Sequence, residues 1–234
     1  MSDIGRMRSK NEDSYCLEAL DGGGLLLAVA DGLGGYLGGE IASAIAVDTL
    51  RERLRSSVGH LEQELRQAVE AANHRVLETA AGRPLVGNMA TTLTAVVLTD
   101  TRCLWAHVGD SRAYLWHQGD MRLLTHDHSV AGELVADGVL ALDEARFHPQ
   151  RNVLTRALGV TEALAVETGT AAIGSGDWLI LATDGLTAVV NGMELEEAVR
   201  AGTAQGPQAL CRELAALANA RGGPDNVTIL AATA

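Results

Sequence analysis

The chain has 234 residues, 47% of them hydrophobic and 21% charged, which is typical of a globular protein that can bury a sizeable core. Its net charge of −12 argues against nucleic acids and anionic membranes as partners. Three widely spaced cysteines, no signal-like start and no long apolar run predict one cytoplasmic domain, residues 1–234, without a disulfide framework.

Short apolar runs bounded by glycine or polar turn residues predict strands along most of the chain. These runs are residues 15–20, 25–30, 91–98, 103–108, 113–116, 165–169, 178–182 and 227–232. Several are joined by only a few turn residues, as at 21–24 and 118–120. Connections this short favour antiparallel pairing over parallel crossovers.

Helical periodicity is clearest in residues 44–54, 61–76 and 210–217, and Pro207 stands where the first turn of the last helix is expected. The first two segments adjoin, so they predict a helical hairpin laid over one sheet. Helices packed outside antiparallel sheets give an α+β fold. Residues 126–159 are polar and rich in histidine, and we expect a loop-rich insert over one sheet edge.

Four aspartates stand at the ends of predicted strands or in tight turns. Asp31 and Asp184 each follow an apolar run and precede a glycine, Asp13 precedes a predicted strand, and Asp225 lies in a Gly-Gly-Pro-Asp-Asn turn. A single Asp-Gly turn is common and needs no ligand. Four such acids together predict one oxygen-rich site, and oxygen ligands favour hard divalent cations.

Other chemical interpretations fit the sequence less well. The glycine-rich segment 32–39 has Leu37 where a dinucleotide fingerprint needs glycine, and no P-loop lysine follows. The His126-Asp127-His128 triplet lacks distal zinc ligands, which favours loop or hinge residues. Ser111 lacks a nucleophile elbow. Glycoside hydrolysis by paired carboxylates stays open, although it needs fewer acids than are present.

A two-metal site would use all of the acids. Two magnesium or manganese ions about 3.5–4 Å apart share a water, lower its pKa and direct it at phosphorus. Arg8 lies on the same short segment as Glu12 and Asp13. Its guanidinium group could bind phosphate oxygens through two hydrogen bonds. The spacing of these residues does not by itself identify a phosphatase.

Eight sequence blocks resemble the metal-dependent protein phosphatase family, of the protein phosphatase 2C type, in its compact bacterial form. The blocks occur in the family order and span nearly the whole chain. They are residues 8–13 (RSKNED), 29–35 (VADGLGG), 87–92 (GNMATT), 107–112 (HVGDSR), 124–129 (LTHDHS), 154–159 (LTRALG), 183–186 (TDGL) and 223–228 (GPDNVT).

The resemblance implies a four-layer α-β-β-α sandwich, with two antiparallel sheets flanked by helices and metal ions at one end between the sheets. It implies that Asp31 bridges two Mn²⁺ or Mg²⁺ ions and that the Gly32 carbonyl binds one of them. By the same analogy, Asp184 and Asp225 complete the other ion. Asp110, with Asp184, would match the third-metal site of bacterial members.

The resemblance also implies the roles of the N-terminal block and of the insert. Glu12 and Asp13 would orient metal-bound water. Asp13 would also be one of the metal ligands. Arg8 would match the phosphate-gripping arginine. Residues 126–159 are similar to the flap that shapes substrate access.

Three features depart from the family pattern. Leu33 stands where relatives have Met or His, so no protonating histidine is expected there. Tyr36 replaces a frequent histidine. The usual first strand is expected to be shortened or missing, which would expose the sheet edge beside Glu12 and Asp13 to pairing.

The family resemblance implies a monomeric enzyme that hydrolyses phosphoserine or phosphothreonine on proteins phosphorylated by a serine/threonine kinase, without a phosphoenzyme intermediate. A pseudophosphatase that binds a phosphoprotein without turnover is the alternative from another class, and the complete set of acids argues against it. A regulator that dephosphorylates a partner-switch protein of a sigma-factor pathway would share the chemistry.

Overall fold

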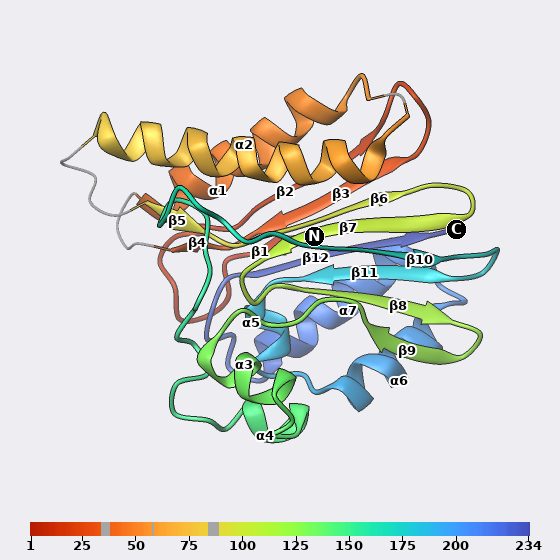
Figure 1. Ribbon diagram of the computed structural model, residues 1–234. Helices are drawn as coiled ribbons and strands as arrows, with labels where there is room; N and C mark the ends of the chain where they lie inside the picture. The colour runs from red at the N-terminus through yellow and green to blue at the C-terminus, as the bar shows by residue number, and fades with distance from the viewer. Residues whose placement is uncertain (34–37, 58, 84–88) are drawn as a thin grey trace.

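The computed structural model describes residues 1–33, 38–57, 59–83 and 89–234 and shows two antiparallel sheets packed face to face (Figure 1). The first sheet has the order β1 (Ser2–Asp3), β12 (Val227–Thr233), β11 (Trp178–Ala182), β8 (Arg112–His117) and β9 (Asp120–Leu123). The second has the order β10 (Glu167–Ala172), β7 (Arg102–Val108), β6 (Leu93–Leu98), β3 (Leu25–Ala30) and β2 (Ser14–Ala19). A two-stranded pair, β4 (Gly32–Leu33) and β5 (Ala90–Thr91), continues from the second sheet.

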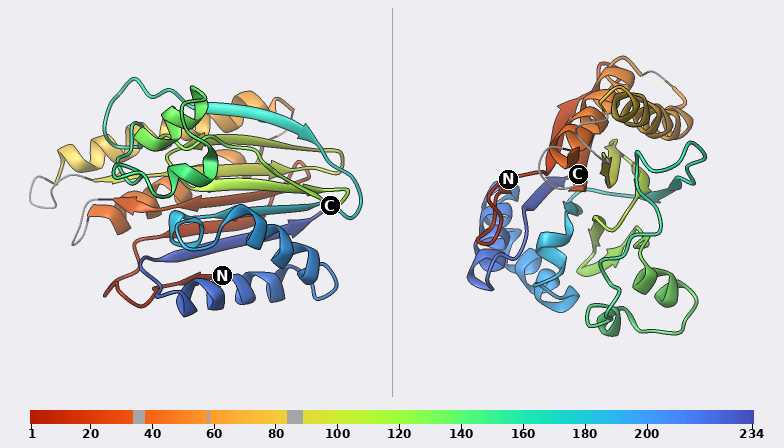
Figure 2. Two further views of the ribbon diagram at one scale, coloured as in Figure 1. Left: turned by 90° about the horizontal axis from the view of Figure 1, so that it is seen from below. Right: turned by 90° about the vertical axis from the view of Figure 1, so that its left-hand side faces the viewer.

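Helices cover the outer face of each sheet (Figure 2). The predicted hairpin is α1 (Gly38–Leu54) and α2 (Leu61–Ala81), which packs on the second sheet. The first sheet is covered by α5 (Asp184–Thr187), α6 (Gly192–Gly202) and α7 (Pro207–Ala220). This confirms the α+β, four-layer α-β-β-α sandwich that was expected. Within the insert lie α3 (Val130–Ala136) and α4 (Leu142–Ala145).

The apolar run of strand β3 contributes side chains to two hydrophobic cores, one under α1 and α2 and one between the two sheets. Leu26 and Ala28 point toward α1 and α2, whereas Leu27 and Val29 point toward the other sheet. Because β3 lies between β2 and β6, both of its faces are covered, and five of its six residues are buried. A strand covered on both faces is a continuous apolar run rather than an alternating one.

The first strand is short, as expected: β1 pairs through Ser2 and Asp3 with Thr228 and Val227 of β12. The main chain of Met1 exchanges two further hydrogen bonds with Ile229. This pairing brings the segment after β1 to the end of the sheet where β12 begins.

Several element boundaries differ from the sequence prediction. The predicted strand 91–98 is divided into β5 and β6, because residues 90–91 pair with β4 whereas residues 93–98 pair with β3 and β7. The strand predicted at 165–169 lies at 167–172, where it pairs with β7. In the described part of the chain, no helix is both long and apolar enough to cross a membrane.

Candidate metal centre

The acids predicted from the sequence meet at one end of the two sheets. Asp31 follows β3, Asp110 lies in the turn from β7 to β8, Asp184 begins α5 after β11, and Asp225 precedes β12. These four side chains line one open cavity of about 260 Å³. Arg8, Glu12, Gly32 and Leu33 line the same cavity.

Asp13 does not line this cavity but lies close to two acids that do. Its Oδ2 accepts a hydrogen bond from Thr183 Oγ1 at 3.0 Å, and its carboxylate is close enough to Asp184 and Asp225 for their charges to act on it. We call Asp13, Asp31, Asp110 and Asp184 the acid cluster. The structure thus brings together every acid that the sequence predicted for the metal site.

Two threonines fix the main chain of Asp31. Thr92 Oγ1 accepts a hydrogen bond from the Asp31 N–H at 2.9 Å, and Thr92 N–H donates to the Asp31 carbonyl at 2.9 Å. Thr91 Oγ1 also donates to that carbonyl, at 2.8 Å. Gly32 has no room for a side chain, since a Cβ there would overlap the main chain of Gly39 and of Glu12. The glycine therefore allows the start of α1 to close on the site.

Asn226 holds the N-terminal block in place. Its Nδ2 donates to the carbonyls of Ile4 and Lys10, both at 2.9 Å, and its Oδ1 accepts from the Glu12 N–H at 2.9 Å. This one buried amide joins the C-terminal Pro-Asp-Asn turn to the N-terminal segment. Residues more than 210 positions apart in the sequence are brought to one site by it.

The acid cluster is electrostatically strained. Burial raises the pKa of Asp13 to about 7, although hydrogen bonds from Thr228 and Thr183 act in the opposite direction. Burial, followed by the negative charge of Asp184, raises the pKa of Asp31 and of Asp110 well above the ordinary value. Burial and the charge of Asp225 raise the pKa of Asp184 as well. Neighbouring carboxyl groups whose simultaneous ionisation is energetically unfavourable are typical of a functional site.

Three carboxylate oxygens in this region are buried without a partner among the described residues: Glu12 Oε1, Asp13 Oδ1 and Asp184 Oδ1. Leaving a buried acceptor unpaired costs about 1–3 kcal/mol. A divalent cation would satisfy such oxygens and offset the repulsion between the acids. The donor set, which consists of carboxylates and the Gly32 carbonyl, therefore fits hard cations.

Arg8 is positioned at the rim of the cavity. Its Nη2 donates to Asp225 Oδ2 at 2.6 Å, and its side chain is 51% exposed. The sequence placed Arg8 beside Glu12 and Asp13, and the structure adds this contact with Asp225. An exposed guanidinium next to an acid-lined cavity is free to turn toward an anionic ligand.

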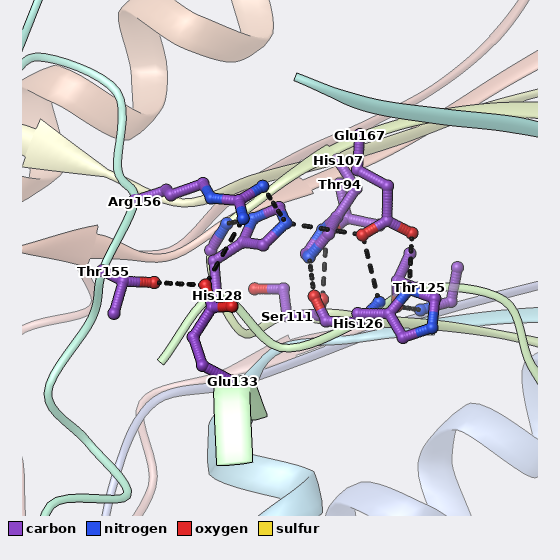
Figure 3. A network of polar contacts seen from close by, with 12 residues as sticks. Thr94, His107, Ser111, Thr125, His126, His128, Glu133, Thr155, Arg156 and Glu167 are labelled. Atoms are coloured by element: carbon purple, nitrogen blue, oxygen red, sulfur yellow. Dashed lines mark hydrogen bonds and ion pairs between the residues drawn. The ribbon is translucent and has the colours of Figure 1, made fainter. Parts of the chain in front are cut away.

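A second polar cluster lies behind the turn that carries Asp110 and was not found from the sequence. It consists of His107, His128 and Glu167, whose ligand-type atoms lie within 4.8 Å of one another, and we call it the histidine cluster (Figure 3). His128 lies in a loop, as expected, and it is buried there, with only 3% of it exposed. Its exposed neighbour His126 reaches the same carboxylate, with Nδ1 at 3.1 Å from Glu167 Oε1.

The histidine cluster has ligand types suited to a metal, but its ring nitrogens already have partners. Burial lowers the pKa of His107 to about 4, so the ring is neutral at physiological pH. Its Nε2 donates to the His126 carbonyl at 3.0 Å, and its Nδ1 accepts from the Thr94 hydroxyl at 2.8 Å. His128 Nδ1 accepts from the Gly109 N–H at 3.1 Å, and its Nε2 lies 3.4 Å from Glu167. We therefore describe this cluster as a hydrogen-bond network.

Comparison with known proteins identifies the family. The family model of protein phosphatase 2C matches residues 6–218. The chain belongs to the protein phosphatase 2C family. This membership confirms both the family that the sequence blocks resembled and the predicted enzyme class, a protein phosphatase. Parts of the family-like blocks, residues 34–35 and 87–88, lie outside the described residues, as does Tyr36.

Individual relatives of this phosphatase match over nearly their full length. The serine/threonine phosphatase stp of Listeria monocytogenes is 34% identical over 234 residues, covering 98% of this chain and 92% of the relative. The serine/threonine phosphatase PstP/Ppp of Mycobacterium tuberculosis has a TM-score of 0.90 at 34% identity and covers 100% and 96% of the two chains. The catalytic domain of PstP in complex with two manganese ions has a TM-score of 0.85 at 33% identity, covering 100% and 95%.

Proposed function

We propose that the protein removes phosphate from phosphoserine and phosphothreonine in proteins that a serine/threonine kinase has phosphorylated. The observation that carries this proposal is the convergence of Asp31, Asp184 and Asp225 on one cavity beside buried, unpaired carboxylate oxygens. The serine/threonine phosphatases among its relatives support the same substrate class. We place the activity in one monomeric, cytoplasmic catalytic domain, residues 1–234, whose insert at 126–159 acts as a flap.

The ions would be Mn²⁺ or Mg²⁺, two in number or three. We assign Asp31 as the shared ligand, with the Gly32 carbonyl on one ion and Asp184 and Asp225 on the other. Asp110, with Asp184, would hold the third, and Asp13 adds a further carboxylate. The two manganese ions in the PstP complex support this assignment. When bound, such ions lower the pKa of water and offset the negative charge of phosphate.

The other catalytic roles are assigned to side chains of this protein and to solvent. Arg8, exposed at the rim, donates to phosphate oxygens and holds the phosphoryl group in line. Glu12 and Asp13 accept hydrogen bonds from the attacking water and orient it, because each has a buried oxygen without another described partner. Leu33 lines the cavity and has no titratable group, so protonation of the leaving alcohol is assigned to solvent.

A non-catalytic binding module is the competing function. It would explain a phosphate-binding arginine, but it gives no reason to keep several mutually repelling acids buried at one cavity. The strain in the acid cluster therefore favours turnover over binding alone. Experiment separates the two proposals cleanly.

The test compares the wild-type protein with Asp31→Ala and with Asp100→Ala, using p-nitrophenyl phosphate and Mn²⁺. Asp100 is an exposed acid in the β6–β7 turn, at the other end of β7 from Asp110, and it serves as the matched control. We expect the wild type and Asp100→Ala to hydrolyse the substrate equally. Asp31→Ala should lower kcat by at least about 10²–10³-fold, the cost of removing one strong electrostatic contribution. A folded, Mn²⁺-bound wild type that shows no hydrolysis would overturn the proposal in favour of the binding module.

A further inference from the structure

A second, smaller cavity, of about 50 Å³, lies under the insert beside the candidate metal centre. Asp110, Asp184 and Asn152 line both cavities, so the two are adjacent. A residue that flanks a phosphorylated residue bound in the first cavity would therefore be within reach of the second. From the insert, Arg146 and Arg151 line this second cavity.

Among the described residues, two of the arginines that face this second cavity have no hydrogen-bonded carboxylate partner. Asp127 also lines it, but Arg112 holds the Asp127 carboxylate with two hydrogen bonds of 2.8 and 2.7 Å. Within the described ranges, neither the Arg146 nor the Arg151 guanidinium forms an ion pair or donates a hydrogen bond, although the Arg151 main-chain N–H donates to the His148 carbonyl. The other two acids, Asp110 and Asp184, belong to the proposed metal centre, where cations would offset their charge.

The insert also keeps its aromatic residue on the surface. Phe147, the one phenylalanine of the sequence, is 78% exposed, and the Arg146 guanidinium lies 5.2 Å from its ring centroid. This contact holds the arginine near the ring. The acid Glu194 already accepts two hydrogen bonds from the Arg221 guanidinium, which lower its pKa, and the Arg146 charge helps to lower it. In a chain of net charge −12, two unpaired arginines beside the site are complementary to an anionic ligand.

We propose that Arg146 and Arg151 form a subsite for a second anionic group of the substrate, a carboxylate or a phosphate on a residue flanking the phosphorylated one. The inference rests on the proposed phosphatase activity and adds sequence selectivity to it. Arginine guanidinium groups bind both kinds of anion through paired hydrogen bonds. The subsite selects substrates and takes no part in the bond that breaks.

The test uses phosphoserine peptides of equal length that differ only at the flanking positions, which carry glutamate, a second phosphoserine, glutamine or lysine. For the wild type, kcat/KM should be about tenfold higher for the glutamate peptide than for the glutamine peptide, the effect of one charge-assisted contact. The doubly phosphorylated peptide separates a phosphate preference from a carboxylate preference. The lysine peptide should be the poorest substrate.

Substitutions then test whether Arg146 and Arg151 cause the preference for the glutamate peptide. Arg146→Gln combined with Arg151→Gln should bring the glutamate-to-glutamine ratio close to 1, and Arg151→Glu should reverse it in favour of lysine. Arg122→Gln, which changes an exposed arginine on β9, is the matched control and should keep the wild-type ratio. A ratio near 1 in the wild type, or a ratio unchanged in the double variant, overturns the inference.

Failure of this inference differs from failure of the proposed function. If the enzyme hydrolyses all peptides equally, the phosphatase activity stands and the subsite is wrong. If no peptide is hydrolysed, the proposed function is wrong, and Kd values for the same peptides, measured by fluorescence anisotropy, then test the subsite alone. A tenfold preference for the glutamate peptide in Kd would support the subsite, and equal Kd values would contradict it.

Discussion

The acid cluster and the histidine cluster lie on either side of one turn, yet their polar groups are satisfied in opposite ways. In the histidine cluster, Glu167 receives hydrogen bonds from His126 and contacts His128, and these partners outweigh burial and lower its pKa to about 2. In the acid cluster, burial and mutual repulsion raise the pKa of Asp13 to about 7. One cluster supports the fold, whereas the other is left incomplete for a ligand.

The turn at Gly109 links the two clusters. His128 N–H donates to the Gly109 carbonyl at 2.7 Å, and the Gly109 N–H donates back to His128 Nδ1. Gly109 has φ +116°, and a Cβ there would overlap Thr92, so only glycine fits between β7 and Asp110. The satisfied cluster thereby fixes the main chain from which the unsatisfied one projects. Supporting contacts of this kind are common behind metal ligands.

The largest expected contrast is in the free energy of unfolding when one carboxylate in each cluster is replaced by its amide. Without metal, Glu167→Gln should lower the free energy of unfolding by about 1–3 kcal/mol, because an amide group then faces hydrogen-bond donors. Asp31→Asn should raise it by about 1–2 kcal/mol, because one repelling charge is removed. Urea denaturation of EDTA-treated protein measures both changes.

Glu70→Gln provides the control for this pair of variants. Glu70 forms an exposed ion pair with Arg66 on α2, so its change should stay within about 0.5 kcal/mol. Destabilisation by Asp31→Asn, equal in sign to that of Glu167→Gln, would show that the acid cluster is not strained.

A second contrast is the dependence of metal-free stability on pH. The folded pKa of Asp13 is raised from 3.8 to about 7, so between these values the folded state binds more protons than the unfolded chain. Stability therefore falls as pH rises from about 4 to 7, by up to about 1.4 kcal/mol per pH unit for each proton. Glu167, with its lowered pKa, loses its stabilising effect only as pH falls toward 2.

Urea midpoints of EDTA-treated protein at pH 5, 6 and 7 measure this slope. Saturating Mn²⁺ should abolish the decrease, because the metal competes with protons for the same oxygens. A metal-free protein that gains stability over this range would contradict the assignment of raised pKa values to the acid cluster.

The smallest expected effect on stability is that of Arg8→Gln. Arg8 and Asp225 have side chains 51% and 28% exposed, so their ion pair should contribute less than about 0.5 kcal/mol. The same change should lower kcat/KM by about 10–100-fold, since it removes the charge assigned to phosphate binding. Equal kcat/KM values for the variant and the wild type would remove Arg8 from the proposed site.

Sequence patterns pointed to the acids of the candidate metal centre more completely than to the network behind it. Asp31 and Asp184 each follow a buried apolar run, and such runs, together with glycine turns, are visible in the order of residues. His107 gave no comparable signal, because a histidine within a strand pattern is indistinguishable from an ordinary core position. Its role depends on Glu167, which lies 60 positions away and becomes its neighbour only through the pairing of β7 with β10.

The sequence by itself determined the apolar runs, the helical stripes and four of the acids, because local periodicity and turn chemistry are properties of neighbouring residues. Asp110 was added only by the resemblance of its motif to the family. Only the tertiary structure decided that Asn226 ties both ends of the chain together, that His128 is buried and that Arg8 contacts Asp225. These contacts join residues far apart in sequence, and their partners are chosen by strand pairing and layer packing. Burial, which sets the pKa of each acid, likewise depends on the whole fold.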